Sequence, residues 1–230
     1  MKKNPRTPLR QRVLPDYTTG EERFNSISHL LGAAIGVVVL VACVVRSVLH
    51  GDAWAVVGSA IYGVSVIALF AMSGIYHGVN PQKAPTAKLV LQVIDHCTIY
   101  VLIAGTYTPI LFVSIRPESP AWAWVIFGMV WGVGIMAMVF TAIDLKKYRV
   151  LSMVCYIALG WCIVIATPIA LRALPAGGLL WLLGGGIAYT VGAIFYGVGA
   201  KKRYMHGVFH VFVLLGSIMH SIFIYFFVLA

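Results

Sequence analysis

Long uncharged stretches alternate with short polar connections along most of the chain. Seven apolar segments of 22 to 25 residues follow one another, at about 27–49, 53–77, 89–113, 121–143, 150–172, 178–199 and 206–230. Because a helix rises 1.5 Å per residue, each segment is long enough to cross a hydrocarbon core of roughly 30 Å. The pattern predicts an all-α protein: a bundle of seven transmembrane helices over residues 26–230, preceded by a basic cytoplasmic tail over residues 1–25.

The composition excludes a soluble globular protein. Of the 230 residues, 60% are hydrophobic and 10% are charged, against roughly 25% charged in a soluble domain. The net charge of +10 does not imply nucleic acid, because most Lys and Arg residues lie in the tail and the connections, where membrane topology and anionic lipid account for them. The expected partner is therefore membrane lipid.

The basic residues also predict the orientation. Of 17 Lys and Arg residues, 14 lie in the tail and in the connections that follow the second, fourth and sixth segments. The side rich in positive charge faces the cytoplasm, so we expect a multi-pass protein of the plasma membrane with its N-terminus inside and its C-terminus outside. Small residues in the fourth and sixth segments predict faces that allow close helix packing: Gly128 and Gly132, and Gly184, Ala188 and Gly192.

Polar side chains inside spans are functional candidates, because lipid does not solvate them. Ser73 and His77 are four residues apart at the end of the second segment, and His206 and His210 have the same spacing at the start of the seventh. Each pair therefore lies on one helix face. Asp95 lies about 9 Å inside the third segment, and His210 about 6 Å inside the seventh. The predicted topology brings all five to one level at the cytoplasmic side.

Three histidines and one carboxylate at one level favour a zinc site. His77, His206 and His210 would supply three ligands and leave a position for water, as in catalytic rather than structural zinc sites. Asp95 is the one carboxylate well inside an apolar segment, so it is the candidate for positioning and deprotonating that water. Taken alone, the His206/His210 pair could equally be hydrogen-bonded or anchor the helix at the interface.

Further polar residues have weaker assignments. Glu22, Asn25 and His29 form a stripe where the first helix enters the membrane. Either Asn25 or Ser26 caps the helix there, or the stripe supports the metal ligands at the cytoplasmic mouth. His220 lies roughly 21 Å along the helix from His206, so we expect an interhelical hydrogen bond, with a gate or substrate contact as the alternative. His96 follows Asp95 by one residue and is expected to pack against a neighbouring helix.

These residues carry a resemblance to a known family. Glu22-x-x-Asn25-x-x-x-His29, Ser73-x-x-x-His77, Asp95 ahead of residues 104–109 (AGTYTP), and His206-x-x-x-His210 with His220 after nine residues occur in this order. The pattern resembles the bacterial haemolysin III proteins of the progestin and adipoQ receptor family, which includes the adiponectin receptors.

The resemblance implies a function as well as a fold. It implies zinc bound by His77, His206 and His210, with Ser73 and Asp95 beside the metal-bound water. It further implies ceramidase-like hydrolysis of lipid amides and a part in membrane lipid homeostasis, with haemolysis as the historical label. The alternative is a non-catalytic membrane sensor or haemolytic protein in which the zinc is structural.

Overall fold

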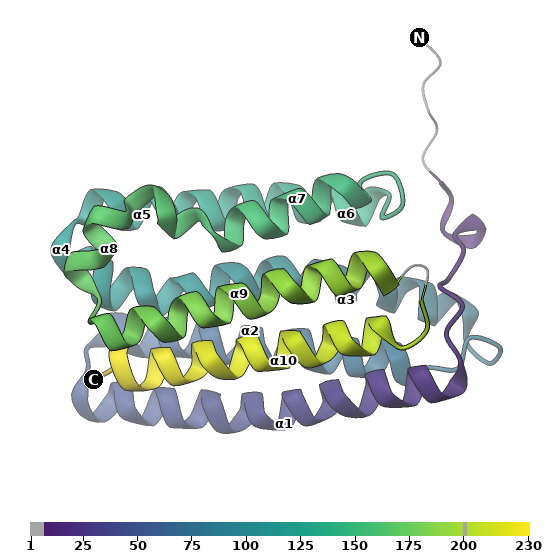
Figure 1. The fold of residues 1–230 in the computed structure, drawn as a ribbon, viewed down its shortest axis with the longest axis horizontal. Helices are drawn as coiled ribbons and strands as arrows, with labels where there is room; N and C mark the ends of the chain where they lie inside the picture. The colour runs from purple at the N-terminus through teal and green to yellow at the C-terminus, as the bar shows by residue number, and fades with distance from the viewer. Residues whose placement is uncertain (1–6, 200–201) are drawn as a thin grey trace, which may run out of the picture.

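The computed structural model describes residues 7–199 and 202–230, and within these ranges every regular element is helical (Figure 1). The elements are η1 (Leu9–Gln11), α1 (Thr19–His50), α2 (Ala53–Gly78), α3 (Pro85–Pro109), η2 (Ile110–Ile115), α4 (Arg116–Glu118), α5 (Pro120–Gly128), η3 (Met129–Val133), α6 (Gly134–Ile143), α7 (Arg149–Gly160), η4 (Cys162–Ala166), α8 (Thr167–Ala173), α9 (Ala176–Gly199), α10 (Met205–Phe223) and η5 (Ile224–Val228). The η elements are 3₁₀ helices (η1 and η4) or π-helical stretches (η2, η3 and η5).

Seven helical stretches within the described ranges are long and apolar enough to cross a membrane, which confirms the predicted bundle. They are Thr19–His50, Ala53–Gly78, Pro85–Glu118, Pro120–Ile143, Arg149–Ala173, Ala176–Gly197 and Met205–Val228. The chain is therefore a multi-pass membrane protein.

The first helix begins earlier than the hydrophobic pattern predicts. Thr18 and Glu21 form a capping box: the Thr18 hydroxyl accepts a hydrogen bond from the Glu21 N–H at 3.2 Å, and Glu21 accepts one from the Thr18 N–H at 2.9 Å. These bonds satisfy N–H groups that have no partner within the helix. Residues 19–25, which the hydrophobic pattern assigns to the tail, therefore form the first turns of α1.

The fifth span is interrupted after α7. Pro168 has no N–H to donate, and its ring clashes with the carbonyl four residues earlier, that of Val164, so regular α-helical bonding cannot continue. Tyr107 of α3 fills the break: its hydroxyl donates to the Gly160 carbonyl at 2.8 Å and accepts from the Ile163 N–H at 3.1 Å. The break thus fixes α7 and η4 against α3.

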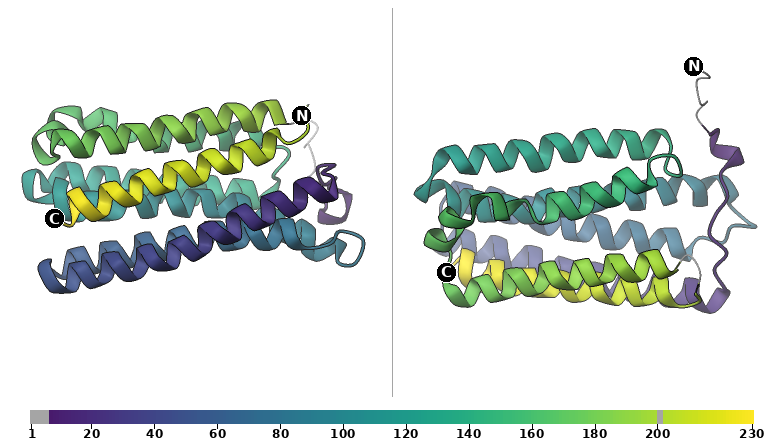
Figure 2. Two further views of the ribbon diagram at one scale, coloured as in Figure 1. Left: turned by 60° about the horizontal axis from the view of Figure 1, so that its bottom comes forward. Right: turned by 45° about the horizontal axis from the view of Figure 1, so that its top comes forward.

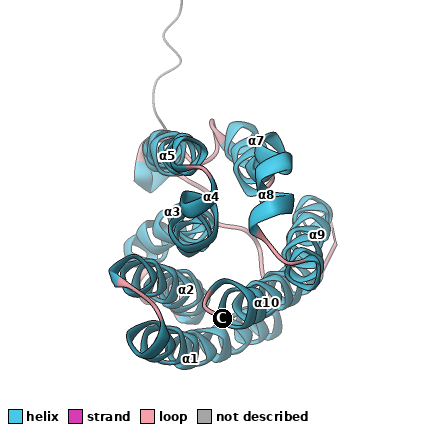
Figure 3. Cartoon of the chain, turned by 90° about the vertical axis from the view of Figure 1, so that its left-hand side faces the viewer, coloured by secondary structure: helices cyan, strands magenta, loops and turns pink. Residues whose placement is uncertain are grey.

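The seven spans run side by side along the long axis of the molecule (Figure 2), and α3 occupies the interior of the bundle (Figure 3). Of the most apolar 18-residue window in each span, 72% is buried in the α3 span and 22% in α1. Helix α1 therefore presents most of its apolar surface to lipid, whereas α3 meets protein on several sides. Figure 1 places the start of α1 at one end of the molecule and the C-terminus at the other. We call these the N-terminal and C-terminal ends of the bundle.

The small-residue faces are confirmed in one predicted helix and wrong in the other. On α9, side chains added at Gly184 and Gly192 would press against Met219 and Phe212 of α10, and Ala188 is buried. The glycines of the fourth span, Gly128 and Gly132, are exposed and have no neighbouring atom within 4 Å of an added Cβ. Sequence spacing could not separate these cases, because protein-facing and lipid-facing surfaces are both apolar in a membrane.

The segment before α1 crosses the N-terminal end of the bundle (Figure 1). The Thr7 N–H donates to a carboxylate oxygen of Asp144 at 2.8 Å, and the Arg12 guanidinium donates to the Ile143 carbonyl at 2.8 Å. Burial alone would raise the pKa of Asp144, but hydrogen bonds from the N–H groups of Thr7 and Lys147 and the nearby Arg12 charge lower it to about 2. The segment is therefore fastened to the turn between α6 and α7.

Candidate metal centre

Three histidines converge at the N-terminal end of the bundle. His77 lies in the last turn of α2, and His206 and His210 lie in the first two turns of α10. All three are buried, and one ring nitrogen of each lies within 4.8 Å of the other two. The Nε2 atom of His206 is 3.3 Å from Nε2 of His77 and 3.1 Å from Nε2 of His210.

The donor set fits a metal cation. Glu22 lies 2.5 Å from Nδ1 of His77, which is the expected place for the proton of a neutral imidazole, so the Nε2 lone pair of His77 is free. Nε2 of His206 faces the Nε2 atoms of both other histidines. A single proton on Nε2 of His206 can form a hydrogen bond to only one of them, so the other contact would have no hydrogen bond. A cation at the point of convergence would satisfy all three lone pairs, and three imidazoles are a ligand set typical of zinc.

The polar stripe on α1 contacts two of the three histidines. Glu22 hydrogen-bonds to His77, and the His29 ring stacks on His210 with a centroid separation of 3.6 Å and an interplanar angle of 17°. Asn25 is 1% exposed, its side-chain amide has no hydrogen-bond partner among the described residues, and it packs beside Gly207. Helix capping, the alternative interpretation of the stripe, instead involves Thr18 and Glu21.

Asp95 and Ser73 line a cavity that His206 and His210 also line. Ser73 is 2% exposed and lies one helical turn before His77. Asp95 lies on α3, and a carboxylate oxygen of Asp95 is 3.6 Å from Nδ1 of His96. The structure thus brings the predicted base and hydroxyl to the wall of a cavity that two of the three clustered histidines also line.

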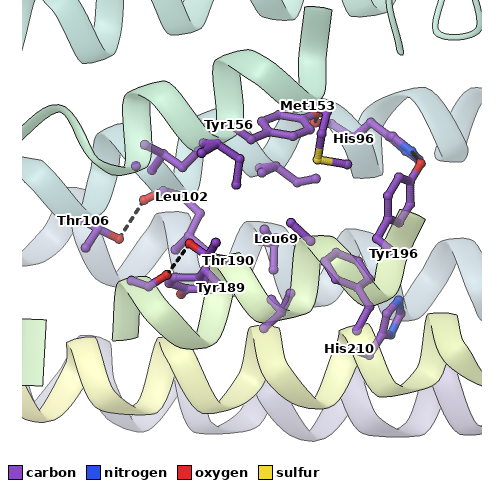
Figure 4. Close-up of a pocket in the computed structure, with 18 of the residues that line it drawn as sticks. Leu69, His96, Leu102, Thr106, Met153, Tyr156, Tyr189, Thr190, Tyr196 and His210 are labelled. Atoms are coloured by element: carbon purple, nitrogen blue, oxygen red, sulfur yellow. Dashed lines mark hydrogen bonds between the residues drawn. The ribbon is translucent and has the colours of Figure 1, made fainter. Parts of the chain in front are cut away.

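The cavity is long and mostly apolar. It has a volume of about 1170 Å³, counting its open mouth, and lies mainly among α3, α7, α9 and α10, with Ser73 of α2 and His29 of α1 also in its wall. Figure 4 shows His210, Tyr196 and His96 at one side of the cavity, and Thr106, Tyr189 and Thr190 towards the other. It therefore extends from the histidine cluster along much of the bundle.

His220 and His96 both line this cavity. The Nε2 atom of His220 lies 3.1 Å from the Leu182 carbonyl of α9, which agrees with the interhelical hydrogen bond predicted for it. His96 packs against Tyr196 of α9, with Nε2 3.4 Å from its hydroxyl. His96 and Asp95 both line the cavity, although adjacent residues of a helix point in different directions.

Sequence reasoning missed two residues at the site. Lys88, counted among the residues of a connection, is buried and bonds to Glu22 at 2.7 Å; its spacing of seven residues from Asp95 was the available signal, since such residues share a helix face. Tyr17 has no signal in the sequence. Its ring stacks on His206 at 5.0 Å, and burial, followed by the proximity of Tyr196, raises its pKa. The segment before α1 thereby covers the histidine cluster.

Fold and site together define the class: a multi-pass membrane protein whose described residues form seven membrane-length helical stretches, with a buried three-histidine cluster near one end. A family model described as "Haemolysin-III related" matches residues 17–221, and the chain belongs to the haemolysin III family. It is 35% identical over 209 residues to "Hemolysin-3" of Bacillus cereus, covering 91% of this chain and 92% of that protein.

Two further relatives extend the likeness. The chain is 35% identical over 201 residues to the "Hemolysin-3 homolog" of Bacillus subtilis (strain 168), covering 87% of this chain and 91% of that protein. It is also 26% identical over 220 residues to the human "Monocyte to macrophage differentiation factor", covering 94% and 87%. The predicted resemblance to haemolysin III proteins is confirmed.

Proposed function

We propose that this protein is a zinc-dependent hydrolase of lipid amide bonds, of the ceramidase-like type, that acts in the plasma membrane and contributes to membrane lipid homeostasis. One observation carries the proposal: His206, His210, Asp95 and Ser73 all border a long apolar cavity inside a membrane-spanning bundle. A metal ion that only holds helices together would not require such a cavity, whereas an enzyme that acts on a lipid would.

His77, His206 and His210 are the residues that would hold zinc, each through Nε2. When bound, zinc supplies a Lewis acid that polarises the amide carbonyl and lowers the pKa of a coordinated water towards roughly 7. The carboxylate of Asp95 orients the attacking water and accepts its proton. The Ser73 hydroxyl, one turn from His77, would donate to the carbonyl oxygen as negative charge develops there.

The reaction consumes one water molecule. The water oxygen bonds to the carbonyl carbon, the carbon–nitrogen bond breaks, and the proton held by Asp95 passes to the leaving nitrogen. The products are a free fatty acid and an amine.

The shape of the cavity suits a long acyl chain. Along α10, His210 and His220 are ten residues apart, which corresponds to about 15 Å. The wall between them is mostly hydrocarbon and aromatic. Burying a methylene group there is worth about 0.8 kcal/mol, so chain length would contribute strongly to substrate affinity.

The test is a lipid hydrolysis assay on purified protein. Long-chain N-acyl lipids are presented in micelles or bilayers, and free fatty acid is followed with and without a chelator. Asp95→Asn should retain zinc, because the three imidazoles remain, but lose roughly 10²–10⁴-fold in turnover. Ser73→Ala should lose less. Glu118→Gln is the control, because Glu118 lies after α3 and pairs with Arg172.

The alternative is a structural role for the metal. The histidines join α2 to α10, and Glu22 and His29 attach α1 to them, so a bound ion would stabilise the bundle without any reaction. If the protein releases no more fatty acid than a metal-free control across a broad panel of N-acyl lipids, the hydrolase is refuted. The protein would then be a membrane sensor or a haemolytic protein with a structural metal.

A further inference from the structure

Lys88 is a buried lysine whose ammonium group is fully hydrogen-bonded. It lies in the first turn of α3 and is 1% exposed. Its Nζ donates to Glu22 at 2.7 Å, to the Tyr76 carbonyl at 2.7 Å and to the His77 carbonyl at 3.3 Å. An ammonium group has three N–H donors, so these three acceptors use all of them.

The position of Lys88 has a physical explanation at the end of α2. Tyr76 and His77 lie in the last turn of α2, where carbonyl groups have no partner within the helix and the helix dipole is negative. The ammonium satisfies two of these carbonyls and also lies 4.6 Å from the centre of the Tyr76 ring. The Glu22 carboxylate supplies the opposite charge that a buried lysine requires.

The same contacts act on a candidate metal ligand from two directions. The carboxylate of Glu22 is shared: one oxygen accepts from Lys88, and the other lies 2.5 Å from Nδ1 of His77. Lys88 therefore touches the backbone of His77 directly and its imidazole through Glu22. Three helices, α1, α2 and α3, meet at this one side chain.

We propose that Lys88 is a positioning residue for the metal site: it fixes Glu22, and Glu22 keeps the proton of His77 on Nδ1 so that Nε2 faces the metal. This inference rests on the proposed metal site but not on catalysis. Without Lys88, the Glu22 side chain, which is 19% exposed, could turn towards water. His77 would then lose the partner that sets its tautomer and ring orientation.

The readout is the zinc dissociation constant of purified protein, measured by competition with a chromophoric chelator. Lys88→Met keeps an unbranched side chain of similar apolar volume but removes the terminal ammonium group, with its charge and its donors. It should weaken zinc binding about 10- to 100-fold, the usual effect of losing a partner behind a metal ligand. Lys83→Met is the matched control, because Lys83 is exposed in the connection between α2 and α3. It should leave the dissociation constant unchanged.

A double variant separates positioning from mere packing. Glu22→Gln should weaken zinc binding by a similar factor. If Lys88 acts through Glu22, the double variant should bind zinc about as tightly as whichever single variant has the lower zinc affinity. Two independent effects would multiply, and that result would overturn the proposed route through Glu22.

The melting temperature of the zinc-free protein identifies a purely structural role. If Lys88→Met lowers it while the dissociation constant stays at the wild-type value, Lys88 only caps α2 and the proposal is wrong. Should Lys88→Met fail to fold, Lys88→Gln is tested in its place, because the amide can still donate to a carbonyl of α2. Unchanged zinc affinity in that variant would equally refute the inference.

The outcomes also separate this inference from the proposed function. Wild-type protein that binds no zinc would remove the basis of both. Wild-type protein that binds zinc without hydrolysing lipid would contradict the hydrolase alone, and the effect of Lys88 on zinc affinity would still be expected.

Discussion

Removing one imidazole from the histidine cluster gives the sharpest test of the candidate metal centre. His210→Ala deletes one of the three convergent ring nitrogens and also the ring on which His29 stacks at 3.6 Å. Two histidines remain, on different helices. We expect zinc content to fall from about one ion per chain to near zero, because two imidazoles are one ligand fewer than catalytic zinc sites use.

The effect of zinc on the melting temperature follows from the linkage between metal binding and folding. Free zinc at 100 times its dissociation constant stabilises the folded state by about 2.7 kcal/mol. For a chain of 150–250 residues, 1 kcal/mol corresponds to roughly 2–4 °C in melting temperature. Wild-type protein in detergent should therefore melt about 5–10 °C higher with zinc than with chelator, and His210→Ala should show almost no such difference.

Deleting the side chain also lowers the stability of the zinc-free protein. This loss is the same with and without zinc, so it does not affect the zinc-dependent difference in melting temperature. His220→Ala is the control: its Nε2 bonds to Leu182 and its ring packs on Gly185, so its loss should lower the melting temperature equally with and without zinc. Equal zinc loss from His210→Ala and His220→Ala would show that the three convergent nitrogens are not the metal site.

Three further predictions concern the bundle itself. A reporter fused after Ala230 should read as external, and a cytoplasmic reading would contradict the orientation inferred from basic residues. Gly105→Ala should destabilise the protein by about 1–3 kcal/mol, because the added methyl overlaps Ser65 of α2, whereas Gly128→Ala should not, and equal melting temperatures would refute this packing. The folded pKa of Asp144, about 2, is below the ordinary value of 3.8, so the carboxylate stabilises the fold above pH 3.8 and this contribution disappears as the pH falls through 2. Asp144→Ala should accordingly lower the melting temperature near neutral pH, and the gap from wild type should narrow in acid; a gap that is constant with pH would contradict the assignment.

Most of the fold could be predicted because one physical quantity determines it. Each of the seven spans must place about 20 apolar residues in hydrocarbon, so composition alone marks them. Helix α1 begins before its apolar segment, because its first turns, from Thr19, are polar and are held by the capping box of Thr18 and Glu21 rather than by burial in lipid. Interior and lipid-facing surfaces could not be separated, as Gly128 and Gly132 show, since hydrophobicity does not distinguish protein contact from lipid contact in a membrane.

The candidate site could be predicted in part for a related reason. His77, His206 and His210 are polar residues near span ends, and helical spacing with a common depth was enough to bring them together. The cavity could not be predicted, because its volume depends on how α3, α7, α9 and α10 pack and on the break in the fifth span. Tyr17 was equally out of reach, since no periodicity fixes the path of a segment that has no regular structure.

Lys88 shows how a correct general rule can hide a specific role. Counted by position, it is one more basic residue in a cytoplasmic connection, and the charge bias that predicts orientation does not depend on it. Its side chain is nevertheless buried, and its ammonium group donates all three of its hydrogen bonds to α1 and α2. The seven-residue spacing to Asp95 places both on one face of α3, towards the helices that hold the histidines. A basic residue at the end of a span should therefore be assigned to topology only after its helix face has been compared with that of the polar residues deeper in the same span.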